Sequence, residues 1–167
     1  KITISANDRV YINPGTTVLF SGSTSGFDID GKFWAVGTQI DSIIFSSSLQ
    51  DSLGNAYNGF YFLENSVDSA CMISYARIEF AYYGFRCLNA NPTFFGNVIE
   101  RSYEYGITMT LGSSPLIEGN TLIKNNTQGT SAKNQISVGL QGNNSPIVRD
   151  NIIYGGSSIP TGGISLW

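Results

Sequence analysis

Three stretches of this chain share one frame and decide its fold: PTFFGNVI (residues 92–99), PLIEGNTL (residues 115–122) and PIVRDNII (residues 146–153). Each begins with proline, carries asparagine five residues later, and places a large apolar residue two positions after each of these. A further copy runs from Cys71, with Ile73, Ala76 and Ile78 in the equivalent positions. Self-similarity at a spacing of about 20–30 residues is the signature of a solenoid.

A second alternating segment follows each unit. Its apolar pairs are Phe60/Phe62, Phe85/Cys87, Ile107/Met109, Val138/Leu140 and Ile164/Leu166. Glycine comes directly before four of these pairs, at Gly59, Gly84, Gly106 and Gly163, and Ser137 takes that place in the remaining one. Alternation with a period of two indicates short strands that bury one face. Because one coil cannot bury its inward residues alone, successive coils must stack.

The repeated asparagines have a specific predicted role. Asn97, Asn120 and Asn151 recur at the same point of the repeat, and asparagine tolerates the left-handed conformation of a tight corner. We therefore expect these side chains to form a ladder in which each amide bonds the next. The third unit is longer, and we place its additional residues in a loop at 125–133.

The composition agrees with a strand-and-turn protein and excludes several partners. Of 167 residues, 41% are hydrophobic, which is ample for a core, and only 13% are charged. The net charge of −3 and scattered basic residues argue against nucleic acid or an anionic membrane surface as a partner. No apolar run approaches the 18 residues of a membrane-spanning helix, so we predict no membrane insertion.

The chain also resembles a known group of proteins. The segments VYINPGTTVLF (residues 10–20), GKFWAVGT (residues 31–38) and IIF (residues 43–45) resemble the opening of secreted bacterial right-handed β-helix proteins. The Pro-x-x-x-x-Asn-x-Ile units resemble the parallel β-helix repeat of the pectate-lyase-like superfamily. Residues 1–167 are therefore predicted to be one all-β domain, a right-handed parallel β-helix of about seven coils with essentially no helix.

This resemblance is nearly silent on activity, because the fold occurs in lyases, hydrolases, adhesins and inert stalks. Pectate lyases of this type use an aspartate cluster, often with calcium, and an arginine base. Here Asp28 and Asp30 alternate on one strand with only Asp41 nearby, which is short of the six to eight oxygens that calcium takes. The histidine elements of related hydrolases and epimerases cannot occur, because the chain has no histidine. We predict no catalytic residues, no metal and no cofactor.

Charged residues at equivalent repeat positions are expected to lie side by side. Glu118 and Arg149 share one position in successive coils and should pair. Glu79 and Glu100 share another position, where like charges repel. Arg77 and Arg101 are close enough in sequence to neutralise them.

The strongest candidate binding site is a group of tyrosines. Tyr82 and Tyr83 precede Gly84, and Tyr103 and Tyr105 precede Gly106, so all four should meet at the same bend of adjacent coils near Glu100 and Glu104. Tyrosine is rigid and amphipathic, which suits a sugar ring. Stacked tyrosines that merely cover a bend between coils are the alternative.

The cysteines and possible glycosylation sites leave alternatives open. Cys71 and Cys87 have neither metal-site nor redox spacing, and buried thiols and a disulfide are both compatible with the sequence. The sequons at residues 125–127 and 143–145 fit exposed loops.

The ends of the chain complete the functional hypotheses. Both ends lie within the strand pattern, so we expect a segment of a longer protein, or coil ends that contact further copies or neighbouring domains. The leading hypothesis is a non-catalytic structural module, such as a stalk, fibre or adhesin-like segment, located outside the cell or on its surface. The alternatives are a carbohydrate-binding β-helix that binds polysaccharide through the tyrosines, and a lyase-like enzyme.

Overall fold

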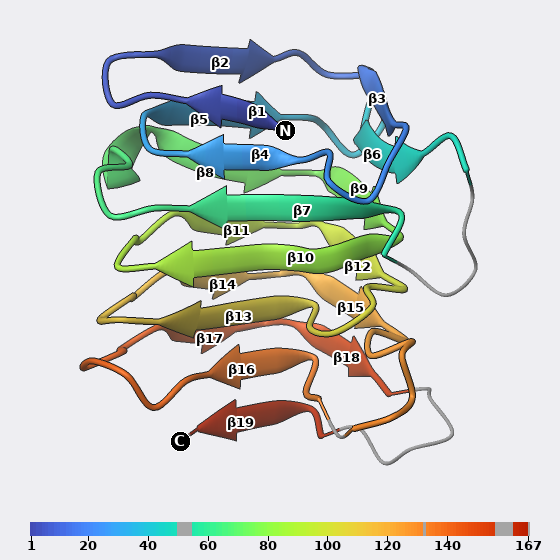
Figure 1. The fold of residues 1–167 in the computed structure, drawn as a ribbon, viewed down its shortest axis with the longest axis vertical. Coiled ribbons are helices and arrows are strands. Elements are labelled where there is room, and N and C mark those ends of the chain that lie inside the picture. The colour runs from blue at the N-terminus through green and yellow to red at the C-terminus, as the bar shows by residue number, and fades with distance from the viewer. Residues whose placement is uncertain (50–54, 132, 156–161, 167) are drawn as a thin grey trace.

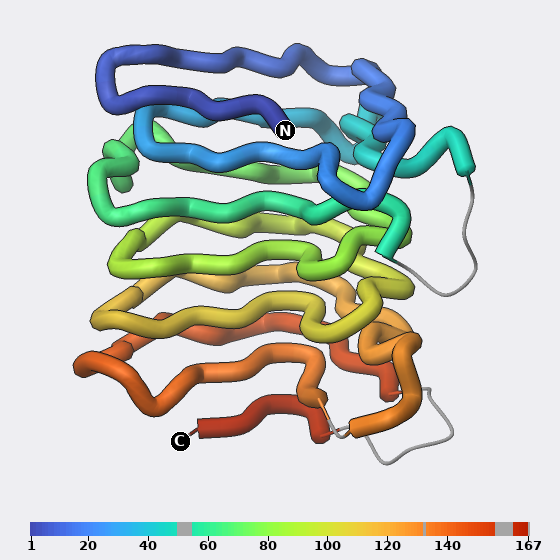
Figure 2. Tube along the Cα trace, in the orientation of Figure 1, coloured from blue at the N-terminus to red at the C-terminus, as the bar shows by residue number. Residues whose placement is uncertain are grey.

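Each turn of the chain places one short strand in each of three parallel sheets, here called A, B and C (Figure 1). The computed structural model describes residues 1–49, 55–131, 133–155 and 162–166. Figure 2 shows the backbone as one continuous coil that runs from the N-terminal turn at one end to the C-terminal turn at the other. Every strand pairs in parallel with the strand three positions along the chain, as a β-helix requires.

The strands of each sheet are short, and they follow the repeat. Sheet A contains β1 (Ile2–Ile4), β4 (Phe27–Ile29), β7 (Tyr57–Phe62), β10 (Ala81–Leu88), β13 (Ile107–Thr110), β16 (Ile136–Val138) and β19 (Ile164–Leu166). Sheet B contains β2 (Arg9–Ile12), β5 (Lys32–Val36), β8 (Cys71–Ser74), β11 (Thr93–Phe95), β14 (Leu116–Glu118) and β17 (Ile147–Arg149). Sheet C contains β3 (Thr17–Phe20), β6 (Ile43–Ser47), β9 (Ala76–Glu79), β12 (Val98–Glu100), β15 (Thr121–Ile123) and β18 (Ile152–Tyr154).

The predicted fold class is confirmed, with one small difference in the number of coils. About six turns are present rather than about seven, because sheets B and C have six strands each and only sheet A has seven. Among the described residues the only helical element is the 3-10 turn η1 (Asp68–Ala70). No helix in this part of the chain has the length and apolar character needed to cross a bilayer.

The core changes in character along the axis. In the first coils it is built from aromatic rings, and the Phe60 ring lies 5.4, 5.8, 4.8 and 5.6 Å from those of Phe27, Phe33, Phe45 and Phe85. From Ile99 onward the buried inward residues are aliphatic: Ile99, Ile107, Met109, Ile117, Leu122, Ile136 and Val138. The shape of the coil is therefore kept while the side chains that fill it become smaller.

The corner between sheets B and C contains the asparagine ladder. The Oδ1 of Asn120 accepts hydrogen bonds from the backbone N–H and side-chain Nδ2 of Asn97, at 3.0 and 2.9 Å. Asn151 Oδ1 does the same for Asn120, at 2.8 and 3.1 Å. Each of these asparagines follows a residue in the left-handed conformation, namely Gly96, Gly119 and Asp150. In the preceding coil Tyr75 takes that conformation, and Ala76 takes the place of the asparagine.

One strand lies two residues earlier than the sequence predicts. Ile136 and Val138 pair with Ile107 and Met109, so they are the inward pair, and Leu140 is 77% exposed beyond the strand. The glycine position is occupied by Gln135, whose carbonyl accepts from the N–H of Ile107. The prediction failed because the glycine that marks this position in other coils is missing here.

Candidate functional site

The four tyrosines meet where the chain turns from sheet C into sheet A. Tyr82 and Tyr83 lie in the first part of β10, and Tyr103 and Tyr105 lie just before β13. Their backbones approach closely because glycine follows them: a Cβ at Gly84 would lie only 2.3 Å from the carbonyl oxygen of Gly106. The glycines therefore allow the tyrosine-bearing turns to stack.

The rings of these tyrosines contact one another across the coils. The Tyr82 and Tyr103 centroids are 5.3 Å apart, and those of Tyr82 and Tyr83 are 4.7 Å apart. Tyr83 and Tyr105 are nearly parallel, with an interplanar angle of 13° and centroids 6.1 Å apart. Tyr61 of β7, which the repeat pattern does not mark, packs edge-on to Tyr83 with the centroids 5.8 Å apart.

Cations extend this group into a strip that crosses the face of sheet A. The Arg86 guanidinium lies 5.4 Å from the Tyr61 centroid and 5.3 Å from that of Tyr83. Lys1 Nζ lies 4.6 Å from the Tyr61 centroid, and Lys133 Nζ lies 5.1 Å from that of Tyr105. We call this set of side chains the cation–tyrosine strip; it consists of Lys1, Tyr61, Arg86, Tyr83, Tyr105 and Lys133. Its members come from five different coils, so it connects most of the length of the solenoid.

Glu104 is the one predicted acid that joins the tyrosines. Its carboxylate accepts a hydrogen bond from the Tyr82 hydroxyl at 3.0 Å and pairs with Lys133 Nζ at 3.6 Å. Partial burial raises the pKa of Tyr83, and the nearby Glu104 carboxylate raises it further. The Tyr83 phenol is therefore a neutral hydrogen-bonding group at physiological pH.

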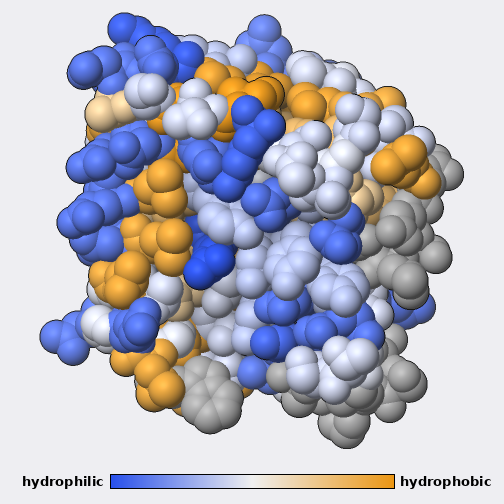
Figure 3. Space-filling model, viewed as in Figure 1, coloured by the Kyte–Doolittle hydropathy of each residue, from blue (hydrophilic) through white to orange (hydrophobic). Residues whose placement is uncertain are grey.

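A shallow depression of about 350 Å³ lies beside Tyr105 on the outer face of β13 and β16. Its lining includes the hydroxyl-bearing Thr108, Thr110 and Ser137 together with the apolar side chain of Leu140. Figure 3 shows this side of the molecule, where hydrophilic and intermediate residues cover the middle and hydrophobic residues gather along the margin at which the sheet A strands end. Hydroxyls beside an aromatic ring and an apolar surface form a polar, uncharged site.

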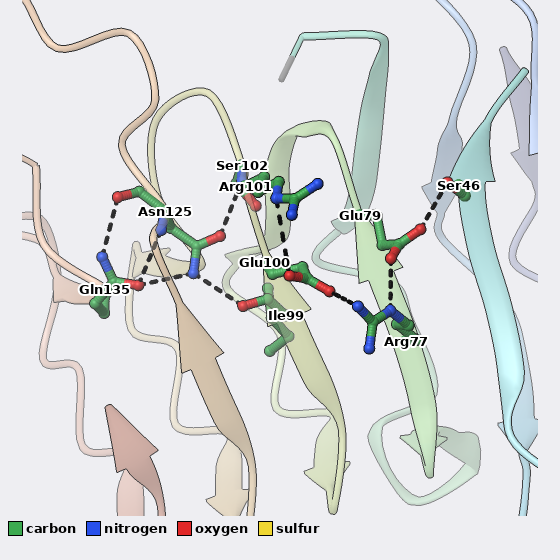
Figure 4. Close-up of polar contacts among 9 residues, drawn as sticks. All are labelled: Ser46, Arg77, Glu79, Ile99, Glu100, Arg101, Ser102, Asn125 and Gln135. Atoms are coloured by element: carbon green, nitrogen blue, oxygen red, sulfur yellow. Dashed lines mark hydrogen bonds and ion pairs between the residues drawn. The ribbon is translucent and has the colours of Figure 1, made fainter. Parts of the chain in front are cut away.

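Glu100 belongs to a cluster with Arg77, Arg101 and Glu79 (Figure 4), and its ion pairs are with arginines of this cluster. It is 6% exposed at the end of β12 and forms ion pairs with Arg77 and Arg101. Arg77 also bonds Glu79, which accepts a further hydrogen bond from Ser46 at 2.9 Å. Although partial burial acts to raise it, the bonds from Arg77 and Ser46 hold the pKa of Glu79 below its ordinary value. Glu79 and Glu100 share one position in the sheet, as predicted, and arginines neutralise them.

A second polar ladder was not predicted from the sequence. At the corner between sheets C and A, Asn125 Oδ1 accepts from the Ser102 N–H at 2.9 Å, and Asn125 Nδ2 donates to the Gln135 side chain at 2.8 Å (Figure 4). Asn125 is fully buried, so its sequon does not lie on an exposed loop as expected. Asn143, in the other sequon, is exposed.

The remaining sequence candidates take part in contacts that hold the coils together. Glu118 and Arg149 pair at 2.8 Å, as expected from their shared position. Asp28 pairs with Lys1, and Asp30 accepts from the backbone and side chain of Asn65.

The cysteine thiols are buried, and the acids of the described residues are dispersed. Cys71 and Cys87 are free thiols inside the core, where burial raises the pKa of both. No group of three or more histidine, cysteine or acidic side chains in the described ranges is arranged to hold a metal ion.

Comparison with known proteins agrees with the architecture. Residues 25–166 match the family described as right handed beta helix region. Neither the curated proteins nor the solved structures gave a match. The stacked parallel sheets and a family match over most of the sequence lead to the same conclusion: the chain belongs to the right-handed β-helix family.

Proposed function

We propose that this chain is a rigid, non-catalytic structural module of an extracellular or cell-surface protein. The observation that carries the proposal is the cation–tyrosine strip, which uses surface aromatic and charged groups to connect coils. At an exposed site each cation–π contact contributes about 0.5–1 kcal/mol to stability. Because these contacts join successive coils, a strip of them stiffens the stack along its axis. Such a surface suits a stalk or fibre segment.

The engagement of the carboxylates supports the non-catalytic part of this proposal. Glu79, Glu100 and Glu104 are each paired with an arginine or a lysine. The pairs Arg77–Glu100 and Lys133–Glu104 connect neighbouring coils, and Arg77 also holds Glu79 within its own strand. A catalytic acid or base needs a proton position facing substrate. Release of unsaturated sugars from a polysaccharide in the presence of calcium would overturn the proposal and favour a lyase.

The extracellular assignment has support from composition. Lysine is scarce, and asparagine, serine, threonine and tyrosine are abundant, which is typical of secreted β-rich proteins. Protease protection of the native protein on intact cells, compared before and after lysis, tests this assignment. Protection that is lost only on lysis would contradict it.

The ends of the stack are the proposed contact surfaces. Among the described residues, β17, β18 and β19 each pair on one side only, and Ile164 and Leu166 of the inward column are exposed there. A parallel coil can cover this edge, either from the same polypeptide, from a neighbouring domain or from a second copy. Electron microscopy of the native protein tests the structural role: long rods or filaments are expected, and compact isolated particles would contradict it.

A second candidate function is carbohydrate binding at the tyrosines. The observation that favours it is the hydroxyl-lined depression beside Tyr105. Retention on insoluble polysaccharide should be lost in Tyr83→Ala and Tyr105→Ala if this function holds. The matched control is Tyr11→Ala, because Tyr11 is 63% exposed on sheet B, away from the depression. Equal retention of all three variants would exclude the site.

A further inference from the structure

Lys133 covers the ring beside which a sugar would bind. Its Nζ lies 5.1 Å from the Tyr105 centroid and 3.6 Å from the Glu104 carboxylate. We propose, on the basis of the carbohydrate-binding candidate above, that the depression takes an uncharged saccharide unit and that Lys133 limits access by covering Tyr105.

Tyr83 covers one face of the Tyr105 ring, so a ligand can stack only on the opposite face. Tyr83 belongs to the preceding coil and packs parallel to Tyr105, whereas Lys133 belongs to the following coil. The two neighbours therefore approach Tyr105 from opposite directions along the solenoid axis. A ligand that stacks on the face of Tyr105 opposite Tyr83 must displace Lys133.

Lys133 is more easily displaced from the cation–tyrosine strip than Arg86. Arg86 lies between two rings, but Lys133 contacts one ring and one carboxylate. It belongs to the long connection between β15 and β16, and lysine has a flexible four-carbon stem. A rotation about that stem uncovers the ring without any change in the coils.

The lining of the depression indicates the chemical class of the ligand. Thr108, Thr110 and Ser137 offer hydroxyls, and Leu140 offers an apolar surface for the non-polar face of a sugar. None of the residues that line it is charged. Two cations near the depression are already engaged: Lys133 pairs with Glu104, and Arg86, which neighbours Thr108 on the adjacent strand, lies over the Tyr61 and Tyr83 rings. A carboxylated sugar would have to compete with these contacts for a positive charge.

Affinity electrophoresis of the folded chain tests the inference. The gels contain a soluble β-glucan, a soluble xylan or polygalacturonate, and the variants are Lys133→Ala, Lys133→Arg and the control Lys32→Ala on sheet B. Lys133→Ala should bind a neutral polymer about two- to fivefold more tightly than the wild type, the factor expected when one exposed cation–π contact no longer competes. Lys133→Arg and Lys32→Ala should match the wild type, and Tyr105→Ala should remove the gain.

The possible results separate the inference from the function on which it rests. If the wild type binds a neutral polymer and Lys133→Ala binds it no better, Lys133 does not limit access, and the inference is wrong although the site remains. If neither protein is retarded in any gel, the site itself fails, and the inference with it. Stronger retardation by polygalacturonate than by the neutral polymers would overturn the assigned ligand class.

An NMR measurement checks the Lys133 contact without any ligand. The ring current of Tyr105 should shift the ε-methylene protons of Lys133 upfield, and Tyr105→Leu should abolish the shift. An unshifted lysine in the wild type would contradict the covering of the ring.

Discussion

The first half of the solenoid and the second half solve the same packing problem with different side chains. Up to Phe94, nine aromatic residues point into the core, and they are Phe20, Phe27, Phe33, Phe45, Tyr57, Phe60, Phe62, Phe85 and Phe94. Beyond Phe94 the inward residues are aliphatic. Both halves keep the same three sheets, so the fold tolerates either filling.

The corners change at the same place as the core. In the first half, each non-glycine corner residue with a left-handed conformation is followed by a buried alanine: Ala56, Ala76, Ala81 and Ala90. In the second half the equivalent positions are polar: Asn97, Ser102, Asn120, Asn125 and Asn151. Alanine brings no hydrogen-bonding group to the corner, whereas asparagine adds an amide. The amide then fills the corner and satisfies backbone groups of the neighbouring coil.

This difference assigns a different source of stability to each half. The first half depends on burial of aromatic surface, which is non-directional. The second half buries less apolar surface per coil and depends more on hydrogen bonds, which fix the register of one coil on the next. Substitutions of the two kinds should therefore have local and distinguishable effects.

The largest expected effect is that of Phe60→Ala. Phe60 is fully buried and contacts four other rings, so its removal leaves a cavity at the centre of the aromatic half. The free energy of unfolding should fall by about 3–5 kcal/mol. Urea denaturation measures the loss, and Tyr11→Ala, at a side chain 63% exposed, should change little. A loss below about 1 kcal/mol would show that the aromatic half can collapse around the gap.

The second-largest effect is expected for Asn120→Ala, in the second half of the solenoid. Asn120→Ala removes the acceptor of two Asn97 donors and the Nδ2 donor to the carbonyl of Phe94, all buried. Leaving such groups unpaired should cost about 2–4 kcal/mol. Hydrogen exchange should quicken at the Asn97 amide more than in β4 or β7, because the damage lies in the second half. Asn143→Ala is the exposed control, and equal exchange throughout the molecule would contradict a division between the halves.

The sequence predicted the second half, with its asparagine ladder, better than the first half, with its aromatic core. The reason is physical. A ladder requires one residue type at one position, so Asn97, Asn120 and Asn151 leave a visible repeat. An aromatic core requires only volume, which different residues supply at different positions. The left-handed corner residues Tyr75, Phe80, Arg101 and Lys124 could not be predicted, because tertiary packing overrides the usual preference for glycine or asparagine there.

The candidate site was predicted in part for a similar reason. The tyrosines were found because each pair precedes a glycine, and Glu104 lies between two of them. Glu100 forms its ion pairs with arginines because nearness in sequence does not fix direction: it belongs to sheet C, and the tyrosines follow the next corner. Arg86 and Lys133 were missed because no repeat marks them, and Tyr61 because it has no counterpart before a glycine.

A smaller effect is expected for Gly84→Ala, at the turn from sheet C into sheet A near the boundary between the two halves. An added Cβ at Gly84 would lie 2.3 Å from the Gly106 carbonyl oxygen and 2.6 Å from a methyl group of Ile99, so Gly84→Ala must push the coils apart. We expect a loss of about 1–3 kcal/mol in thermal or urea unfolding. Gly22→Ala is the matched control, because its nearest neighbour would be 3.9 Å away. Equal stability of the two variants would mean that the turn yields without cost.

The smallest effect is a pH dependence located at the same boundary. The pKa of Glu79 is lower in the folded chain than its ordinary value, so its bonds with Arg77 and Ser46 stabilise the fold above that ordinary value. This stabilisation is lost as the pH falls through the folded-state pKa.

Because the pair is partly exposed, the contribution at neutral pH should be at most about 1 kcal/mol. The stability difference between the wild type and Glu79→Gln should therefore shrink on acidification. When Arg77→Met and Ser46→Ala are both present this trend should reverse, because bonds that lower the pKa of Glu79 are gone and the burial that raises it remains. The charged cluster lies on β9 and β12, at the boundary between the two halves. At low pH the amides of these two strands should therefore lose protection from hydrogen exchange before those of β4 or β15. Simultaneous loss in all four strands would show that the boundary does not act as a separate unit.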